Sequence, residues 1–242
     1  MTEHSEQDAA QNAFAKLANI AQNRASVYHL LTLLFRDPTP ELVEHLLSGK
    51  LYQEVQDLVQ WLDADVSIFD KAFAALTQAT TENKGQNRDD ILRGLKVEYA
   101  RLFIGPGPAL VSPYQTIYCD PPHPDGSVVM MGQSAARVKK AYQEAGLTVA
   151  SDYREPPDHI AVEFEFLYYL CKRESDAWQE DNNAARKWRS LERRFIDENL
   201  GKWALEFCRQ VTEVSQIGFY VAVALLADTF IRMESGHFSP RR

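Results

Sequence analysis

Apolar residues recur at steps of three and four along most of the chain, and this spacing is typical of amphipathic helices. The first helical segment begins near Ala13 and ends at Asp37-Pro38, because proline cannot continue a helix. Thr39-Pro40-Glu41 then has the features of a helix start: a capping hydroxyl, a proline in the first turn and an acid near the positive end of the helix dipole. The same spacing predicts further helices over about residues 52–62, 67–79, 89–103, 133–146, 157–178, 184–198, 203–214 and 216–233.

An irregular segment rich in glycine and proline interrupts the helical pattern near the middle of the chain. Gly105-Pro106-Gly107-Pro108 cannot continue a helix, and further prolines extend the irregular segment to about Gly126. Short extended pieces are expected at residues 116–118 and 128–130, but nothing in the pattern supports a sheet. A connection of about twenty residues is uncommon inside a compact domain unless it is functional or a hinge.

These patterns predict an all-α fold, a single domain of about nine or ten helices. We divide it into an N-terminal helical half (10–104), a hinge loop (105–127) and a C-terminal helical half (128–236). Such a hinge would permit a homodimer in which two copies exchange helical halves.

Composition and charge narrow the class of protein. The chain has 242 residues, of which 45% are apolar and 25% charged, so it is not a disordered chain. Acidic residues outnumber basic ones by 34 to 26, and the net charge of −8 argues against broad binding of nucleic acid. The polar residues after Met1 do not form a secretory signal, and no apolar stretch approaches the roughly 20 residues of a membrane span. We therefore expect a cytoplasmic protein without stable membrane insertion.

The usual catalytic and metal-binding motifs are missing from the sequence. Cys119, Cys171 and Cys208 have no ligand spacing, so we expect reduced thiols and no bound metal. Gly105-Pro106-Gly107 follows a helix and lacks the remaining residues of a phosphate-binding loop. Neither a G-x-S-x-G nor an H-E-x-x-H pattern occurs. The sequence thus offers none of these catalytic signatures, and we expect no cofactor.

Aromatic and charged residues elsewhere have simple structural interpretations. The four tryptophans occur among helically spaced apolar residues and are expected in the core; they are Trp61, Trp178, Trp188 and Trp203. The charged run from Arg186 to Arg194, which includes Glu192, is expected to form a solvated helix face.

The segment that begins at Pro156-Pro157 carries a denser group of polar residues. Proline predicts a helix start here, and Asp158 in the first turn is favoured by the helix dipole. His159 and Glu163 are four residues apart and share a helix face, so His159 is a candidate partner for a Glu163 carboxyl flanked by apolar positions. Capping and a satisfied buried pair explain these residues without any binding role.

Two segments of the chain carry distinctive groups of short motifs. The first comprises Glu98-Tyr99, Leu102-Phe103, Gly105-Pro106-Gly107, Pro113-Tyr114 and Thr116-Ile117-Tyr118. The second comprises Pro157-Asp158-His159-Ile160 and Glu163-Phe164-Glu165-Phe166-Leu167. Together the two segments resemble the TorD/DmsD family of cytoplasmic chaperones for molybdenum enzymes. Nearer the C-terminus, Leu200, Trp203 and Phe207 match a further family pattern, but Asn199 stands where the family has histidine.

The resemblance implies an all-helical protein without catalytic activity. Such chaperones bind the twin-arginine signal peptide or the body of an apo-molybdoenzyme, support cofactor insertion and delay export. The resemblance assigns client binding to Asp158, His159, Pro113, Tyr114 and Tyr118, to which we add Glu163 from its place beside His159. Gly105, Pro106, Gly107 and Pro157 are expected to be structural residues of the two motifs. The alternative function is a helical protein that binds or hydrolyses GTP or another nucleotide, with Asp158 and His159 as polar ligands.

Overall fold

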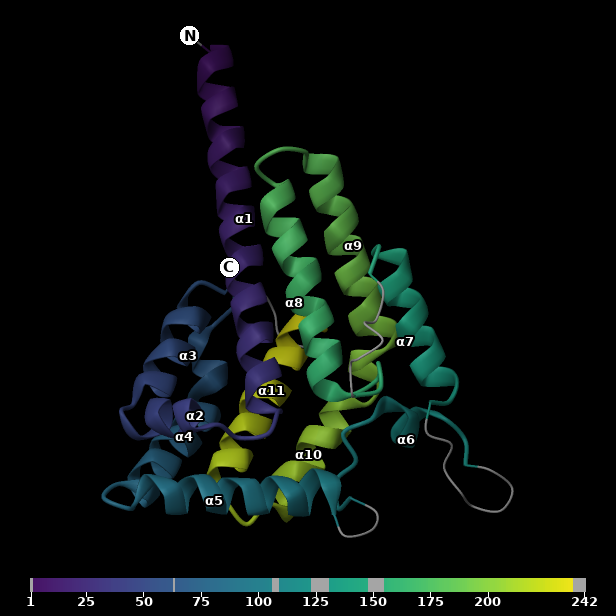
Figure 1. The fold of residues 1–242 in the computed structure, drawn as a ribbon. Coiled ribbons are helices and arrows are strands. Elements are labelled where there is room, and N and C mark those ends of the chain that lie inside the picture. Colours follow the sequence, from purple (N-terminus) through teal and green to yellow (C-terminus); the bar gives the residue numbers. More distant parts are fainter. Residues whose placement is uncertain (1, 63, 106–108, 123–130, 148–154, 237–242) are drawn as a thin grey trace.

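The computed structural model describes residues 2–62, 64–105, 109–122, 131–147 and 155–236, and the regular structure in these ranges is entirely helical (Figure 1). The α-helices are α1 (Thr2–Leu34), α2 (Pro40–Leu47), α3 (Lys50–Gln60), α4 (Asp70–Asn83), α5 (Arg88–Tyr99), α6 (Gln115–Cys119), α7 (Gln133–Glu144), α8 (Ile160–Ala177), α9 (Asn182–Glu198), α10 (Ala204–Val214) and α11 (Gly218–Glu234). Shorter turns are η1 (Val66–Phe69), the π-helical η2 (Ala100–Ile104) and η3 (Leu200–Lys202). The predicted all-α fold is confirmed.

Helix α6 lies where the sequence analysis expected an extended piece, so that expectation is wrong for residues 116–118. The backbone N–H of Thr116, in the first turn of α6, donates to Asp158 Oδ2 at 2.9 Å. This cap comes from a residue far along the chain, and local sequence therefore does not reveal it. The other expected extended piece, 128–130, lies outside the described residues.

The helices of the two halves pack into one core. Helix α1 runs along α8, and α11 packs between α4 and α10, so α1–α8 and α4–α11 make the most extensive contacts between the halves (Figure 1). A single large cluster of buried side chains includes residues from every part of this arrangement, among them Tyr28, Phe35, Phe164 and Phe230. The two halves are therefore parts of one domain. Among the described helices, none is long and apolar enough to cross a membrane.

The tryptophans differ in burial. Trp203 and Trp178 are buried, and Trp188 is partly buried beside Tyr169. Trp61 is 62% exposed, so the prediction that it belongs to the core is wrong. The physical reason is its position: α3 ends at Gln60, and Trp61 follows as the C-cap, beyond the last turn whose apolar face is buried.

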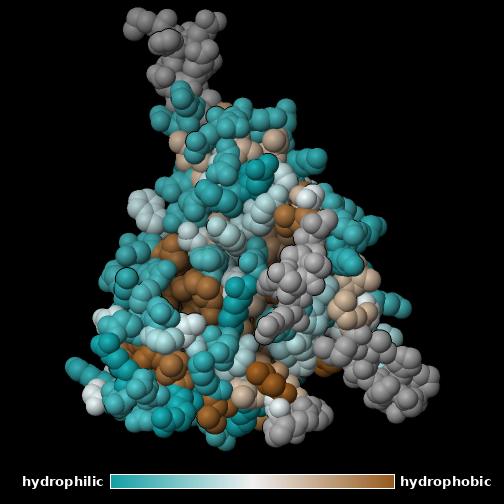
Figure 2. Space-filling model, viewed as in Figure 1, coloured by the Kyte–Doolittle hydropathy of each residue, from teal (hydrophilic) through white to brown (hydrophobic). Residues whose placement is uncertain are grey.

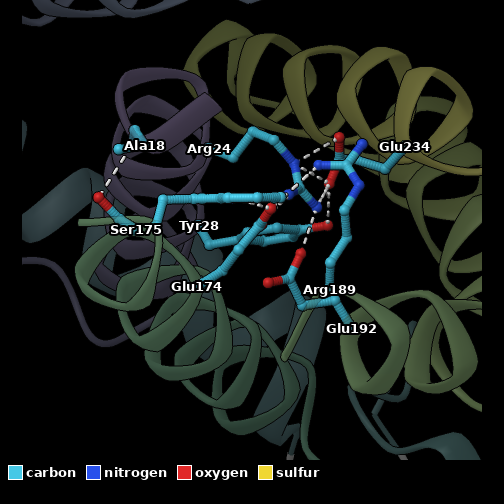
Figure 3. A network of polar contacts seen from close by, with 9 residues as sticks. Ala18, Arg24, Tyr28, Glu174, Ser175, Arg189, Glu192 and Glu234 are labelled. Carbon is cyan, nitrogen blue, oxygen red and sulfur yellow. Dashed lines mark hydrogen bonds and ion pairs between the residues drawn. The ribbon is translucent and has the colours of Figure 1, made fainter. Parts of the chain in front are cut away.

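A buried polar network joins α1, α8, α9 and α11 (Figure 3). Arg24 of α1 lies at its centre and contacts Glu174 at 3.0 Å, Glu192 at 2.7 Å and Glu234 at 2.5 Å. All three carboxyl groups are nearly or fully buried. The expectation that Glu192 lies on a solvated face is therefore wrong, because α9 turns this one member of its charged run toward Arg24.

Candidate functional site

A groove opens between the two halves of the fold. It has a volume of about 750 Å³ and lies among the C-terminal end of α1, helices α2 and α3, the turn η2, the loop at Pro113-Tyr114 and the start of α8. Segments from both halves of the chain thus contribute to one cavity. Its size is in the range of sites that hold small ligands or the side chains of a bound peptide.

The groove is mainly apolar. Leu34, Phe103 and Val162 are buried against the core beneath it. Leu33 and Ile104 also line the groove, and they remain 48% and 60% exposed. Figure 2 shows apolar atoms lying in hollows bordered by hydrophilic atoms on this face of the molecule. Exposed apolar walls over an apolar floor favour a partner that supplies apolar side chains.

The charged residues that line the groove are mostly acidic; they are Arg36, Asp37, Glu41, Glu54 and Glu155, with His45 beside them. Two of these charges have partners of opposite sign on neighbouring helices, because Arg36 contacts Glu165 at 2.8 Å and Lys96 contacts Asp37 at 3.0 Å. Glu41 and Glu54 are exposed and take part in none of the described ion pairs. The rim therefore has a negative potential that favours a cationic partner.

One wall of the groove forms where the central loop pairs with the start of α8. Tyr114 and His159 form an isolated antiparallel bridge. On either side of it, Ile160 N–H donates to the Pro113 carbonyl at 2.8 Å, and Gln115 N–H donates to the Asp158 carbonyl at 3.0 Å. The two motif segments singled out in the sequence analysis are therefore in direct contact.

His159 is the N-cap of α8 and part of this wall. Its Nδ1 accepts a hydrogen bond from the Ala161 N–H at 3.1 Å, so the described geometry requires an unprotonated Nδ1. Burial, together with the nearby Arg36 charge, lowers the pKa of His159 to about 4. Helix α8 thus begins at Ile160, three residues later than Pro157, and the expectation that Asp158 lies in its first turn is wrong.

Tyr114 completes the wall. Its ring meets the His159 ring edge-on, with centroids 5.3 Å apart, and its hydroxyl donates to Glu155 Oε2 at 3.1 Å. Burial raises the pKa of the Tyr114 hydroxyl, and the Glu155 carboxylate raises it further, so the phenol stays neutral. Pro113, Tyr114 and His159 all line the groove.

Asp158 lies behind this wall and is buried. Its Oδ2 accepts hydrogen bonds from the N–H of Thr116 at 2.9 Å and from the Thr116 hydroxyl at 2.6 Å. The carboxylate therefore holds α6 against the start of α8. In this conformation it offers no exposed oxygen for an ion pair with a client arginine.

Glu163 and Tyr118 also face the interior. The fully buried Glu163 carboxyl accepts from Trp203 Nε1 at 3.4 Å, and burial raises its pKa well above the ordinary value. The candidate pairing of its side chain with His159 is wrong, because α8 directs the two side chains to Trp203 and Ala161 respectively. Tyr118 packs on Trp203 with ring centroids 5.3 Å apart and donates to the Ser112 carbonyl at 2.9 Å.

The structural residues of the motifs have local roles where they are described. Gly105 adopts a φ of 68°, a left-handed conformation that favours glycine. The Pro157 carbonyl accepts from the Tyr142 hydroxyl at 2.7 Å, which ties the start of α8 to α7. Pro106 and Gly107 lie outside the described residues.

The sequence analysis missed the groove residues from the N-terminal half. Leu33, Glu41 and Glu54 come from three helices whose relation to α8 depends on tertiary packing. The Thr39-Pro40-Glu41 start signal correctly predicts α2, but a start signal does not identify which surface the helix borders. In the part of the chain that the structure describes, no three acidic, histidine or cysteine side chains are grouped as a metal site.

The chain is similar in sequence to known proteins over most of its length. The family model described as Nitrate reductase delta subunit matches residues 62–209, more than half of the chain. Chaperone protein TorD of Shewanella pealeana is 25% identical over 233 residues, which cover 94% of this chain and 95% of that protein. Chaperone protein TorD of Aliivibrio fischeri is 26% identical over 220 residues, which cover 90% and 96%.

A solved structure from Archaeoglobus fulgidus, "Putative Redox Enzyme Maturation Protein", is 24% identical and aligns over 88% of this chain and 92% of that chain, with a TM-score of 0.45. The family match over residues 62–209 includes both segments that form the wall, the loop at Pro113-Tyr114 and the start of α8 at His159.

Proposed function

The chain belongs to the nitrate reductase delta subunit family, and from this premise we propose that it is a maturation chaperone for a molybdenum oxidoreductase. The TorD relatives are chaperones by name and align over nearly their whole length. The protein is accordingly a binding protein and not an enzyme. Its client is the apo-oxidoreductase, recognised through the twin-arginine signal peptide, through the folded body, or through both.

One observation carries the signal-peptide part of this proposal: the groove combines an apolar interior with an acidic rim. A twin-arginine signal peptide offers the complementary chemistry, two adjacent cations and an apolar stretch. An apolar stretch laid into a groove transfers its side chains from water, and rim carboxylates attract the arginines during encounter. Glu41 and Glu54, which belong to none of the described ion pairs, are the rim charges assigned to the arginines.

The six predicted client-binding residues divide by position. Pro113, Tyr114 and His159 line the groove and are proposed to contact the client. The other three are proposed to act from behind by holding the wall and the helix beneath it; they are Asp158, Tyr118 and Glu163. His159 and Tyr114 are neutral, which suits a partner whose positive charges pair with the acidic rim of the groove.

The remaining parts of the proposal concern place and assembly. We place the chaperone in the cytoplasm, where its client is synthesised before export. The hinge at residues 105–127 and a homodimer that exchanges helical halves remain proposals, and such an exchange would have to rebuild the α1–α8 and α4–α11 contacts between copies. The nucleotide-binding alternative receives no support from the family match or the relatives.

The test is a binding titration with a fluorescent peptide that contains two arginines followed by an apolar stretch. Ile104→Ser removes an apolar wall of the groove and should weaken binding about tenfold. Val97→Ser is its matched control, since Val97 is 64% exposed and does not line the groove.

A second pair of variants tests the rim. The double variant Glu41→Gln/Glu54→Gln should weaken binding about 3- to 10-fold at low salt and less at high salt, because exposed charges are screened. The exposed pair Asp57→Asn/Glu180→Gln changes the net charge equally at residues outside the groove. Equal effects of each variant and its control would reject the groove as the binding site.

A further inference from the structure

One side of the groove is built by an irregularity in the helix that follows α5. Tyr99, Phe103 and Ile104 all line the groove, and they come from the last residue of α5 and from η2. On a regular α-helix, positions five apart are separated by about 140°, so Tyr99 and Ile104 would face different directions. The π-helical turn widens the helix, and its Gly105 N–H donates to the Ala100 carbonyl at 2.6 Å. This i→i+5 geometry brings both side chains to the groove.

Glu98 lies at the base of this turn, is buried, and does not line the groove. Its carboxylate accepts from Arg101 Nε at 2.6 Å and from Arg101 Nη2 at 2.7 Å. It also accepts from the Gln216 N–H at 2.6 Å and from the Ser215 hydroxyl at 3.1 Å. Burial opposes ionisation, but these donors prevail and lower the pKa of Glu98. The carboxylate is therefore charged at neutral pH.

Arg101 extends the same network to the end of α10. Its Nη2 donates to the Val214 carbonyl at 2.6 Å while the guanidinium remains paired with Glu98. Arg101 is itself a residue of η2, so one ion pair ties the π-helical turn to the connection between α10 and α11. A bidentate pair of this kind restricts both the distance and the orientation of the guanidinium.

We propose that Glu98 is a positioning residue for client binding: by anchoring Arg101 to the α10–α11 connection, it keeps η2 in the π-helical form that presents Phe103 and Ile104 to the groove. This inference rests on the proposed function of the groove. A strained or unusual turn needs support from its surroundings to persist. Glu98 supplies it with four hydrogen bonds from three residues.

The test variant is Glu98→Gln, which keeps the size of the side chain and an acceptor for Gln216 but removes the charge paired with Arg101. The amide of Gly105, whose hydrogen bond defines the π turn, should exchange about tenfold faster. Affinity for the twin-arginine peptide should fall about 2- to 30-fold. This is the range for a residue that influences a binding site without contacting the ligand. Asp90→Asn is the matched control, because Asp90 and Arg93 form an exposed i,i+3 pair on the same helix.

Arg101→Lys is measured in parallel, so the inference stays testable if Glu98→Gln does not fold. It keeps the positive charge but loses the bidentate contact with Glu98. Like Glu98→Gln, it should speed the exchange of the Gly105 amide and weaken peptide binding. Faster Gly105 exchange with weaker peptide binding in the folded variants supports the proposal. A lower melting temperature with unchanged affinity reduces Glu98 to a structural residue and overturns it. If the wild type binds no such peptide, the proposed function and the role of Glu98 in client binding fail together. Unchanged Gly105 exchange in both folded variants overturns the positioning role by itself, whatever the wild type binds.

Discussion

The buried network around Arg24 predicts an unusual dependence of stability on pH. Three buried carboxyl groups surround one buried guanidinium. Among the residues that the structure describes, the only other cation in an ion pair with them is Arg189, half exposed at 3.3 Å from Glu174 (Figure 3). Tyr28 and Cys171 also lie close, and burial raises the pKa of each, so both are neutral. Glu192 shares Arg24 Nη2 with Glu234, and burial raises the pKa of Glu192 to about 7 despite the Arg24 charge.

The sign and size of the effect follow from this pKa. In the unfolded chain Glu192 ionises around pH 4.5, whereas in the folded protein it keeps its proton to about pH 7. The folded state therefore binds more protons in this window, and its stability falls as the pH rises. At about 1.4 kcal/mol for each pH unit, the loss sums to about 3 kcal/mol above pH 7.

Replacing Glu192 by glutamine tests this reasoning, because glutamine resembles the protonated carboxyl in shape and charge. The variant should be within about 1 kcal/mol of the wild type near pH 5 and more stable by about 3 kcal/mol at pH 8. For a chain of this size that difference raises the melting temperature by about 6–12 °C. The measurement is thermal unfolding from pH 5 to pH 8.5 for the wild type, Glu192→Gln and the exposed control Glu180→Gln.

Comparing two curves removes the contributions of other titrating groups, including His159. If the melting temperatures of Glu192→Gln and the wild type run parallel over this pH range, Glu192 does not hold a proton in the folded state. The negative charge of the three carboxyl groups around Arg24 would then be compensated by something other than a proton on Glu192.

Other predictions concern the wall and the surface. Asp158→Ala should cost about 3 kcal/mol in urea unfolding, since it removes the acceptor of two hydrogen bonds from Thr116, while Asp158→Asn, which keeps one acceptor, should cost less than half of that. The lowered pKa of His159 means that stability is lost as the pH falls from about 6.5 toward 4, and His159→Asn, which retains a capping side chain, should flatten this acid branch of the melting curve. Trp61→Ser should change the free energy of unfolding by less than about 0.5 kcal/mol, and a larger loss would mean that this exposed ring packs in the native state.

Local signals predict most of the helices because their causes are local. Thr39 caps α2 as expected, with its hydroxyl accepting from Leu42 N–H at 3.3 Å. Gly146 follows the end of α7 with a φ of 80°, the left-handed conformation expected of a C-terminal glycine. In both cases the residue that signals the helix end lies within one turn of that end.

The residues that sequence reasoning misplaced depend on distant partners. Asp158 is a residue type that commonly caps helices and lies just before α8, yet its hydrogen-bond partner is Thr116 on α6. Glu192 belongs to a charged run, yet it is buried in the core in contact with Arg24 of α1. The short helix α6 depends on the same Asp158 contact. No local pattern contains these partners, so each interpretation failed at the step from local structure to packing.

The candidate site was predicted in part for the same reason. The two motif segments that the sequence analysis singled out meet at the Tyr114–His159 bridge. The opposite side of the groove, with Leu33 of α1 and Glu54 of α3, depends on how the N-terminal helices pack against α8. The contribution of Ile104 depends on a π-helical turn that apolar spacing alone does not distinguish from an α-helix.

The most direct test of the central claim is to locate the bound client on the protein. A twin-arginine peptide with a photoreactive phenylalanine analogue in its apolar stretch would be cross-linked to the full-length chain, and the attachment sites identified by mass spectrometry. The groove account predicts cross-links at Leu33, Ile104 and Tyr114, and their loss in competition with unlabelled peptide. Competable cross-links confined to the face formed by α7 and α9, with none at the groove, would contradict it.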